Sequence, residues 1–418
     1  MENEIRANLS NPEKLEKLYR DDRKTFRTSF EKIYPEIEST EMGKFWKARL
    51  EYDYKPDILK AFSFSEIAIV VAIGLFAAFL IKIPDLFQLS SAEDFYQKNA
   101  AIIVFFGLTL YTVWFNRITE PKRILLTALA FLVPVIFINL LPSGDQGDSV
   151  ILAFIHLPLL MWFVFGVVFT GYKFRDLDKR IDFIRYNGDL AIVYGLIAIA
   201  GGILTAITVG LFDSIGLDIE NFYMENIVIS GAVAAPVIAA YLIEKFPNMV
   251  SKIAPLIAGI FSPLVLITLI VFLITIVVTG KDPYNDRDFL IIFNVMLLGV
   301  MGIIIFSVSL TSVVKKQRFN ALVLFVLAIV TILIDLIALS AIFYRLGEYG
   351  LTPNRLAVLV SNILVLANLI LIMIDLFRIN FRKKEFRILE MTVAKYLPVY
   401  LAWIIIVVFA FPLIFRMK

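Results

Sequence analysis

Residues 321–345 read ALVLFVLAIVTILIDLIALSAIFYR, an almost unbroken apolar run with one acid, Asp335, near its centre. A helix of roughly 20 apolar residues is long enough to cross the hydrocarbon core of a membrane. Ten further apolar runs of similar length occur along the chain, so that the full set is 64–81, 99–116, 124–141, 149–171, 190–212, 223–243, 253–279, 289–311, 321–345, 356–377 and 397–415. The sequence therefore predicts an all-α fold, a polytopic transmembrane helical bundle of about eleven spans.

The composition excludes several classes of protein. Hydrophobic residues make up 59% of the 418 residues, against roughly 45–50% in soluble domains. The absence of cysteine excludes disulfides and thiolate chemistry, and the single histidine, His156, makes histidine-based metal sites and relays poor candidates. No GxxxxGK[ST] run is present. We assign no catalytic residue, no metal ligand and no cofactor, and we expect no secretory signal peptide because residues 1–60 lack an apolar core.

The charges of the connecting segments predict the orientation of the spans. The connections that follow even-numbered runs, such as 117–123, 172–189 and 378–396, are more basic than those that follow odd-numbered runs. Because basic connections stay on the cytoplasmic side, the N-terminus is expected to be cytoplasmic and the C-terminus extracytoplasmic. Within one basic connection, residues 174–184 predict an amphipathic helix in the headgroup layer.

Residues 1–60 are expected to form a cytoplasmic amphipathic segment, separate from a transmembrane domain at 61–418. Ser10 and Glu13 resemble a capping box at the start of a helix over 10–34, which Pro35 would end before a second helix over 41–52. The resulting helical hairpin either packs on the cytoplasmic connections or uses residues 10–52 to bind a cytosolic or membrane protein partner. Thirteen basic residues balance thirteen acidic ones over 1–60, so we expect no nucleic-acid partner.

Polar residues inside the spans are the first candidates for function, since a charge at a helix centre costs at least about 2.5–3.5 kcal/mol on insertion scales. Asp335 and Asn368 lie at similar depth in consecutive antiparallel spans. Asp335 is a proton or cation site, a structural carboxyl bonded to Asn368, or a residue of a wet vestibule without function. Asn362 and His156 are further transport or proton-relay candidates, although His156 is more simply a hydrogen-bonded residue between helices.

The connection between the ninth and tenth runs, 349–355, reads YGLTPNR. Gly350 permits a tight turn with positive φ, and Thr352 can cap a helix that begins at Pro353. The segment is either a capped, salt-bridged helix start or an external gate or headgroup site. The external gate candidates are Arg345, Glu348, Thr352, Asn354 and Arg355.

Four short motifs carry a resemblance to a family. They are NPEKLEKLY at 11–19, IRYNGD at 184–189, the YGLTPNR segment, and YLPVY at 396–400. Together they resemble the DUF4153 family of bacterial integral membrane proteins, in its Bacteroidetes variants. The resemblance implies a location in the bacterial inner (cytoplasmic) membrane, and it brings no established activity with it. Read by themselves, Asn187, Gly188 and Asp189 predict a turn and N-cap before the fifth span.

Three classes of function remain open. Asp335 and the prolines within the spans favour a channel or secondary permease for an ion or small solute. The N-terminal hairpin and short connections favour a membrane subunit of a larger assembly, or a signalling protein, without transport activity. An enzyme acting on a lipid-linked substrate would use acids of the external connections, and the candidates are Glu93, Asp94, Asp145 and Asp148.

Overall fold

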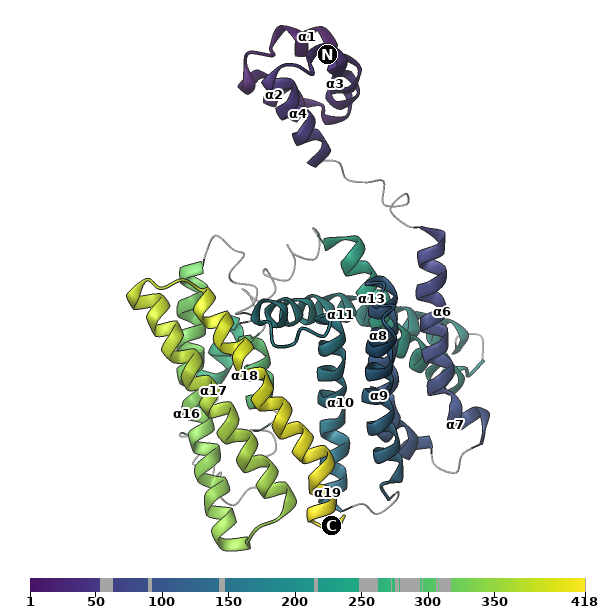
Figure 1. The fold of residues 1–418 in the computed structure, drawn as a ribbon, viewed down its shortest axis with the longest axis vertical. Helices are drawn as coiled ribbons and strands as arrows, with labels where there is room; N and C mark the ends of the chain where they lie inside the picture. The colour runs from purple at the N-terminus through teal and green to yellow at the C-terminus, as the bar shows by residue number, and fades with distance from the viewer. Residues whose placement is uncertain are drawn as a thin grey trace. The chain divides into compact units, whose positions relative to one another are not determined.

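The computed structural model describes most of the chain, and the described residues are helical, without a strand among them (Figure 1). The description covers residues 1–52, 63–88, 92–142, 147–213, 217–247, 262–271, 273–274, 278, 294, 296–305, 307 and 317–417. The chain divides into two compact units, Met1–Ile67 and Ala68–Lys418. The predicted boundary near residue 60 therefore lies a few residues before the observed one.

Residues 1–52 of the N-terminal unit, the part described before α6, form four helices where the sequence predicted a two-helix hairpin. They are α1 (Glu2–Ala7), α2 (Pro12–Asp21), α3 (Arg23–Ile37) and α4 (Glu41–Tyr52). Aromatic rings form the centre of this unit, because Trp46 is almost fully buried with its ring centroid 5.4 Å from that of Tyr19 and 4.9 Å from that of Phe26. The unit therefore has a core of its own.

The prediction of one helix over 10–34 is wrong because a cap residue interrupts it. Asp22 adopts an extended conformation and its side chain accepts a hydrogen bond of 3.0 Å from the backbone N–H of Thr25, which starts a new helix. Asn11, rather than Ser10, caps α2. Pro35 does not end the helix either, since it lies inside α3.

The second unit contains the membrane helices. Nine helices of the described residues are long and apolar enough to cross a membrane: α6 (Phe64–Ile81), α8 (Ala92–Phe115), α9 (Pro121–Leu140), α10 (Asp148–Phe169), α11 (Leu177–Asp213), α12 to α13 (Glu220–Lys245), α16 (Gln317–Tyr349), α17 (Pro353–Arg382) and α18 to α19 (Arg387–Ile414). Each coincides with a predicted run, so a multi-pass membrane protein is confirmed. The remaining runs, 253–279 and 289–311, are described only in part, and the described part includes short apolar helices at Ser262–Val271 and Met296–Ile305.

Helix α11 differs from its prediction, because it runs without a break through the expected turn at Asn187–Asp189. The amide of Asn187 is satisfied within the bundle: its Oδ1 accepts from Trp162 Nε1 at 2.8 Å and its Nδ2 donates to the carbonyl of Phe183 at 2.6 Å. Its side chain therefore joins α11 to α10 and does not cap a new helix.

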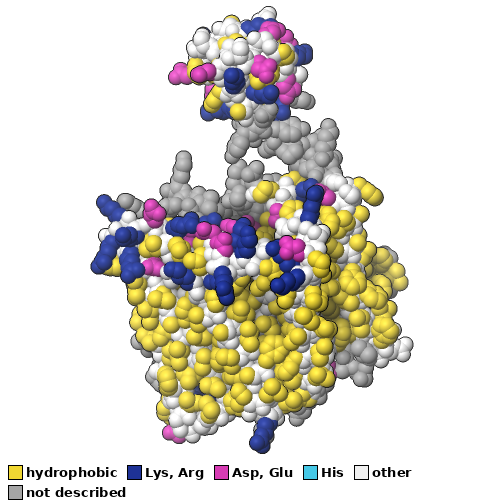
Figure 2. All heavy atoms as spheres, in the orientation of Figure 1, with side chains coloured by type: hydrophobic (Ala, Val, Ile, Leu, Met, Phe, Trp, Pro, Cys, Tyr) yellow, Lys and Arg dark blue, Asp and Glu magenta, His cyan; other side chains and the backbone are white. Residues whose placement is uncertain are grey.

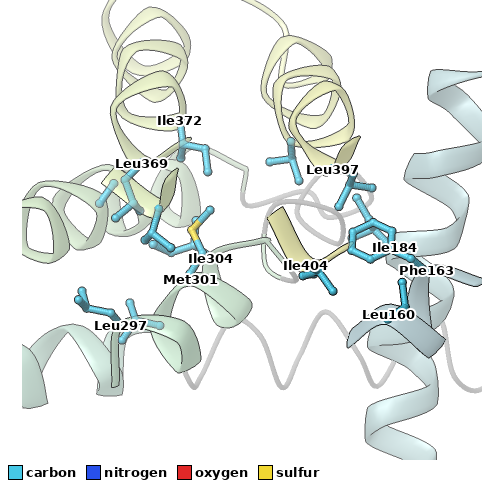
Figure 3. Packing of buried hydrophobic residues seen from close by; sticks show 14 of the residues in the cluster. Leu160, Phe163, Ile184, Leu297, Met301, Ile304, Leu369, Ile372, Leu397 and Ile404 are labelled. Carbon is cyan, nitrogen blue, oxygen red and sulfur yellow. The ribbon is translucent and has the colours of Figure 1, made fainter. Parts of the chain in front are cut away.

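The largest core cluster joins α10, α17 and α18. Figure 3 shows Leu369 and Ile372 of α17, Leu397 of α18, and Phe163 of α10 within one buried cluster. The surface of this unit is strongly segregated: charged side chains gather at one end, over the connection between α17 and α18, and a broad apolar surface lies beyond them (Figure 2). Such a surface is the one that a lipid bilayer covers.

Candidate functional site

A polar stripe follows helix α17 along the side that faces α18. Its residues recur every seven positions, which is close to two helical turns, and they are Asn354, Ser361, Asn368 and Asp375. The three inner members each bond to a side chain of α18: Trp403 Nε1 donates to Ser361 at 2.9 Å, Asn368 Nδ2 donates to the Tyr400 hydroxyl at 3.0 Å, and the Thr392 hydroxyl donates to Asp375 at 2.5 Å. The two helices are thus joined by hydrogen bonds through their length.

Asp335, in the middle of α16, has no comparable partner. The residue is fully buried, and neither carboxyl oxygen has a hydrogen-bond partner among the described residues. The Oδ1 of the fully buried Asn368 also has no hydrogen-bond partner in the part of the chain that the structure describes. Asp335 lies close enough to Tyr400 to interact with it electrostatically, and Tyr400 is the residue that accepts from Asn368. Three buried acceptor oxygens, two of Asp335 and one of Asn368, are therefore unsatisfied among the described residues of this part of the bundle.

The predicted hydrogen bond between Asp335 and Asn368 is not present, which corrects the structural interpretation of Asp335. The Asn368 amide donates to Tyr400 instead. The reason is the rotation of α17 about its axis, which turns its polar stripe toward α18. The side-chain N–H of Asn368 therefore meets Tyr400 of α18.

A cavity of about 550 Å³ lies beside the loop that joins α16 to α17, and we call it the loop pocket. The described residues that line it come from three helices and two further positions. They are Asp148, Ile151 and Ile155 of α10, Ile342 and Arg345 of α16, Asn354, Arg355 and Val358 of α17, the cap residue Thr352, and Asn294. Four of the five external gate candidates therefore line one cavity. Glu348 does not line it, although it belongs to the same end of α16.

The start of α17 is built as the sequence predicted. Gly350 has φ +74°, and the Thr352 side chain caps the helix by accepting from the backbone N–H of Arg355 at 3.3 Å. Arg355 Nη1 donates to the carbonyls of Tyr349 and Gly350, both at 2.7 Å. These bonds hold the loop against the start of the helix, so Arg355 stabilises the wall of the loop pocket.

Polar groups continue inward from the loop pocket. Asn294, which lines the pocket, accepts a hydrogen bond of 2.9 Å from Asn362, and Asn362 is buried. Asn368 follows Asn362 by six residues, roughly 9 Å along the helix, and Asp335 precedes Ile342 of the pocket wall by seven, roughly 10 Å. The pocket and the unsatisfied oxygens are therefore about two helical turns apart.

The other candidates lie elsewhere. His156 donates from Nδ1 to the carbonyl of Leu152 in its own helix at 2.8 Å and does not line the loop pocket. Glu93 and Asp94 lie in the first turn of α8, and Asp145 is outside the described residues. Where the chain is described, no three His, Asp or Glu side chains are grouped closely enough to hold a metal ion.

Sequence reasoning missed two members of the site. Asp148 was considered only as an acid of an external connection, yet it shares the loop pocket with Arg345. Tyr400 stood out only as part of the YLPVY motif, yet its hydroxyl accepts a hydrogen bond from Asn368. One signal for Tyr400 was present, because Thr392, Tyr396, Tyr400 and Trp403 recur at helical spacing on one face.

No family model matches the chain, and neither the curated proteins nor the solved structures contain a match. The resemblance to the DUF4153 family stays a prediction. The function must therefore be argued from the loop pocket and the surroundings of Asp335.

Proposed function

We propose that the chain is a channel or secondary permease of the bacterial inner membrane in which Asp335 binds the moving proton or cation. The single observation that carries this proposal is the buried carboxyl of Asp335 without a hydrogen-bond partner among the described residues. Buried polar groups in folded proteins are almost always hydrogen-bonded, and each exception calls for an explanation. An acid inside a membrane span is by default a functional group, because its burial is costly.

The chemistry around Asp335 suits a small cation. Its two carboxyl oxygens and the Oδ1 of Asn368 are acceptors without a donor, and oxygen ligands are those that a proton or a hard cation takes. A bound proton or cation would satisfy the carboxyl of Asp335. The loop pocket and its Asn294–Asn362 pair supply polar groups over much of the distance between the loop and Asp335.

Flux measurement in proteoliposomes tests the proposal. The full-length protein is reconstituted, and uptake of H⁺, Na⁺ and K⁺ is followed with ion-sensitive dyes for the wild type, Asp335→Asn and Asp375→Asn. Asp375 is the matched control, because it is also a buried acid of a span but has partners in Arg378 and Thr392. We expect Asp335→Asn to lose flux by about tenfold or more and Asp375→Asn to retain it.

Two results would overturn the permease. One is the absence of flux for every ion with the wild type, and the other is equal flux with Asp335→Asn. Either result would favour the alternatives, which are a membrane subunit of a larger assembly and an enzyme for a lipid-linked substrate.

The topology that we propose has eleven spans, with the N-terminus cytoplasmic and the C-terminus extracytoplasmic. It is supported by the alternation of basic and acidic connections. Because the chain has no cysteine, single cysteines introduced at Lys384 and Gly347 can be labelled without background. An impermeant maleimide applied to intact spheroplasts should label Gly347→Cys and leave Lys384→Cys unlabelled. The reverse pattern would show the opposite orientation and contradict the proposed topology.

A further inference from the structure

The loop pocket contains charges of both signs that are not paired with each other. Asp148 contributes a carboxylate from the first turn of α10, and Arg345 a guanidinium from the end of α16. Neither side chain forms an ion pair or hydrogen bond with another described residue. Arg355 differs from them, since it already donates to the carbonyls of Tyr349 and Gly350. Among the described lining residues, Asp148 and Arg345 are therefore the charged side chains without a partner, and Arg355 adds a second positive charge whose Nη1 is already engaged.

A cavity lined by charges of both signs favours a ligand that carries both a positive and a negative group. An anion alone would be attracted by Arg345 and Arg355 but repelled by Asp148, and a cation alone would be attracted by Asp148 but repelled by the two guanidinium groups. A ligand with one positive and one negative group satisfies both side chains at once. Both residues are partly buried, so a ligand that pairs with them is less screened by water than it would be on an open surface.

Four of the other lining residues are apolar: Ile151 and Ile155 of α10, Ile342 of α16 and Val358 of α17. The uncharged polar residues Thr352, Asn354 and Asn294 complete the described lining. Small-molecule sites are typically clefts of roughly 300–1,000 Å³ with mostly apolar walls and a few well-placed polar groups. At about 550 Å³ the loop pocket falls in this range. The ligand is thus expected to carry an aliphatic part beside its charges.

We propose that the loop pocket binds a zwitterion with an aliphatic body, its ammonium group at Asp148 and its carboxylate or phosphate at Arg345. Two kinds of molecule share this chemistry: a free aliphatic α-amino acid, and a zwitterionic phospholipid whose acyl chain lies along the isoleucines. The proposal deepens the permease proposal by naming the class of its substrate, and it depends on that proposal for the ligand's role, though not for binding itself.

A panel of ligands on the wild-type protein is the primary test, because it depends on no variant. Calorimetry on the full-length protein in detergent compares leucine with leucinamide, which lacks the carboxylate, and with 4-methylpentanoate, which lacks the ammonium. Native mass spectrometry of protein from nanodiscs compares phosphatidylethanolamine with phosphatidylglycerol. In one of the two comparisons, we expect the zwitterion (leucine or phosphatidylethanolamine) to bind about tenfold or more tightly than the singly charged molecules.

Variants then assign the charges. Asp148→Asn and Arg345→Gln should each weaken binding of the zwitterion about tenfold or more. Glu348→Gln is the matched control, because it removes a charge at the same end of α16 but outside the pocket lining. Its affinity should equal that of the wild type. Melting temperatures of the three variants show whether any loss of binding reflects misfolding.

The outcomes separate this inference from the permease. Saturable leucine binding identifies a soluble substrate, and retention of phosphatidylethanolamine alone identifies a lipid; either supports the proposal. Equal binding of singly charged analogues, or no zwitterion binding by the wild type, overturns it. Asp335→Asn should bind as the wild type does. Zwitterion binding without ion flux would refute the permease proposal and support the zwitterion site. Ion flux without zwitterion binding would refute only the zwitterion site.

Discussion

Replacing Asp335 by asparagine should leave the protein as stable as the wild type or more stable. The change is nearly isosteric and removes no hydrogen bond, because both carboxyl oxygens lack partners among the described residues. The loss of about 1 kcal/mol that usually follows the removal of a hydrogen bond is therefore not expected. If the carboxyl is ionised, its removal from the helix centre relieves up to about 2.5–3.5 kcal/mol.

Asp375→Asn provides the contrast, because Asp375 accepts from the Arg378 guanidinium at 3.1 Å and from the Thr392 hydroxyl at 2.5 Å. Arg378 is half exposed, which weakens its contribution. We therefore expect a loss of about 1–3 kcal/mol from the two bonds together. Unfolding of the purified variants by heat in one detergent, followed by tryptophan fluorescence, measures both effects. A loss of more than about 1 kcal/mol in Asp335→Asn would show that this carboxyl is bonded after all, and would refute the reasoning.

Three further changes test the fold. Tyr400→Phe removes the acceptor of the Asn368 amide, so the melting temperature should fall by the equivalent of about 1–2 kcal/mol, and an unchanged value would contradict this bond. Gly166→Ala places a Cβ 2.7 Å from a ring carbon of the fully buried Phe183, and should lower thermal stability by about 1–3 kcal/mol. Trp46→Ala should cost about 3–5 kcal/mol and unfold the small N-terminal unit; limited proteolysis of the full chain should then remove that unit and spare the membrane helices, and protection of both would contradict the prediction.

Local features of the sequence were enough to predict much of the structure. The run 321–345 is apolar throughout, and hydrophobic transfer makes such a segment a membrane helix whatever its neighbours are. The loop between α16 and α17 was also predictable, because the positive φ of Gly350 and the cap at Thr352 depend on a few adjacent residues. The prediction of one helix over 10–34 was wrong for a related reason. The apolar spacing favoured a continuous helix, but the side chain of Asp22 caps a new helix within it.

The sequence by itself determined the class of the protein, its membrane helices and the acid at the centre of one of them. Only the tertiary structure decided that Asn368 bonds to Tyr400, that Asp335 lacks a partner among the described residues, and that Asp148 shares a cavity with Arg345. Hydropathy and helix caps act over a few residues, so they can be read along the chain. The partner of a buried side chain depends on which helices pack together and how each is rotated, and that is set by many weak contacts between distant segments.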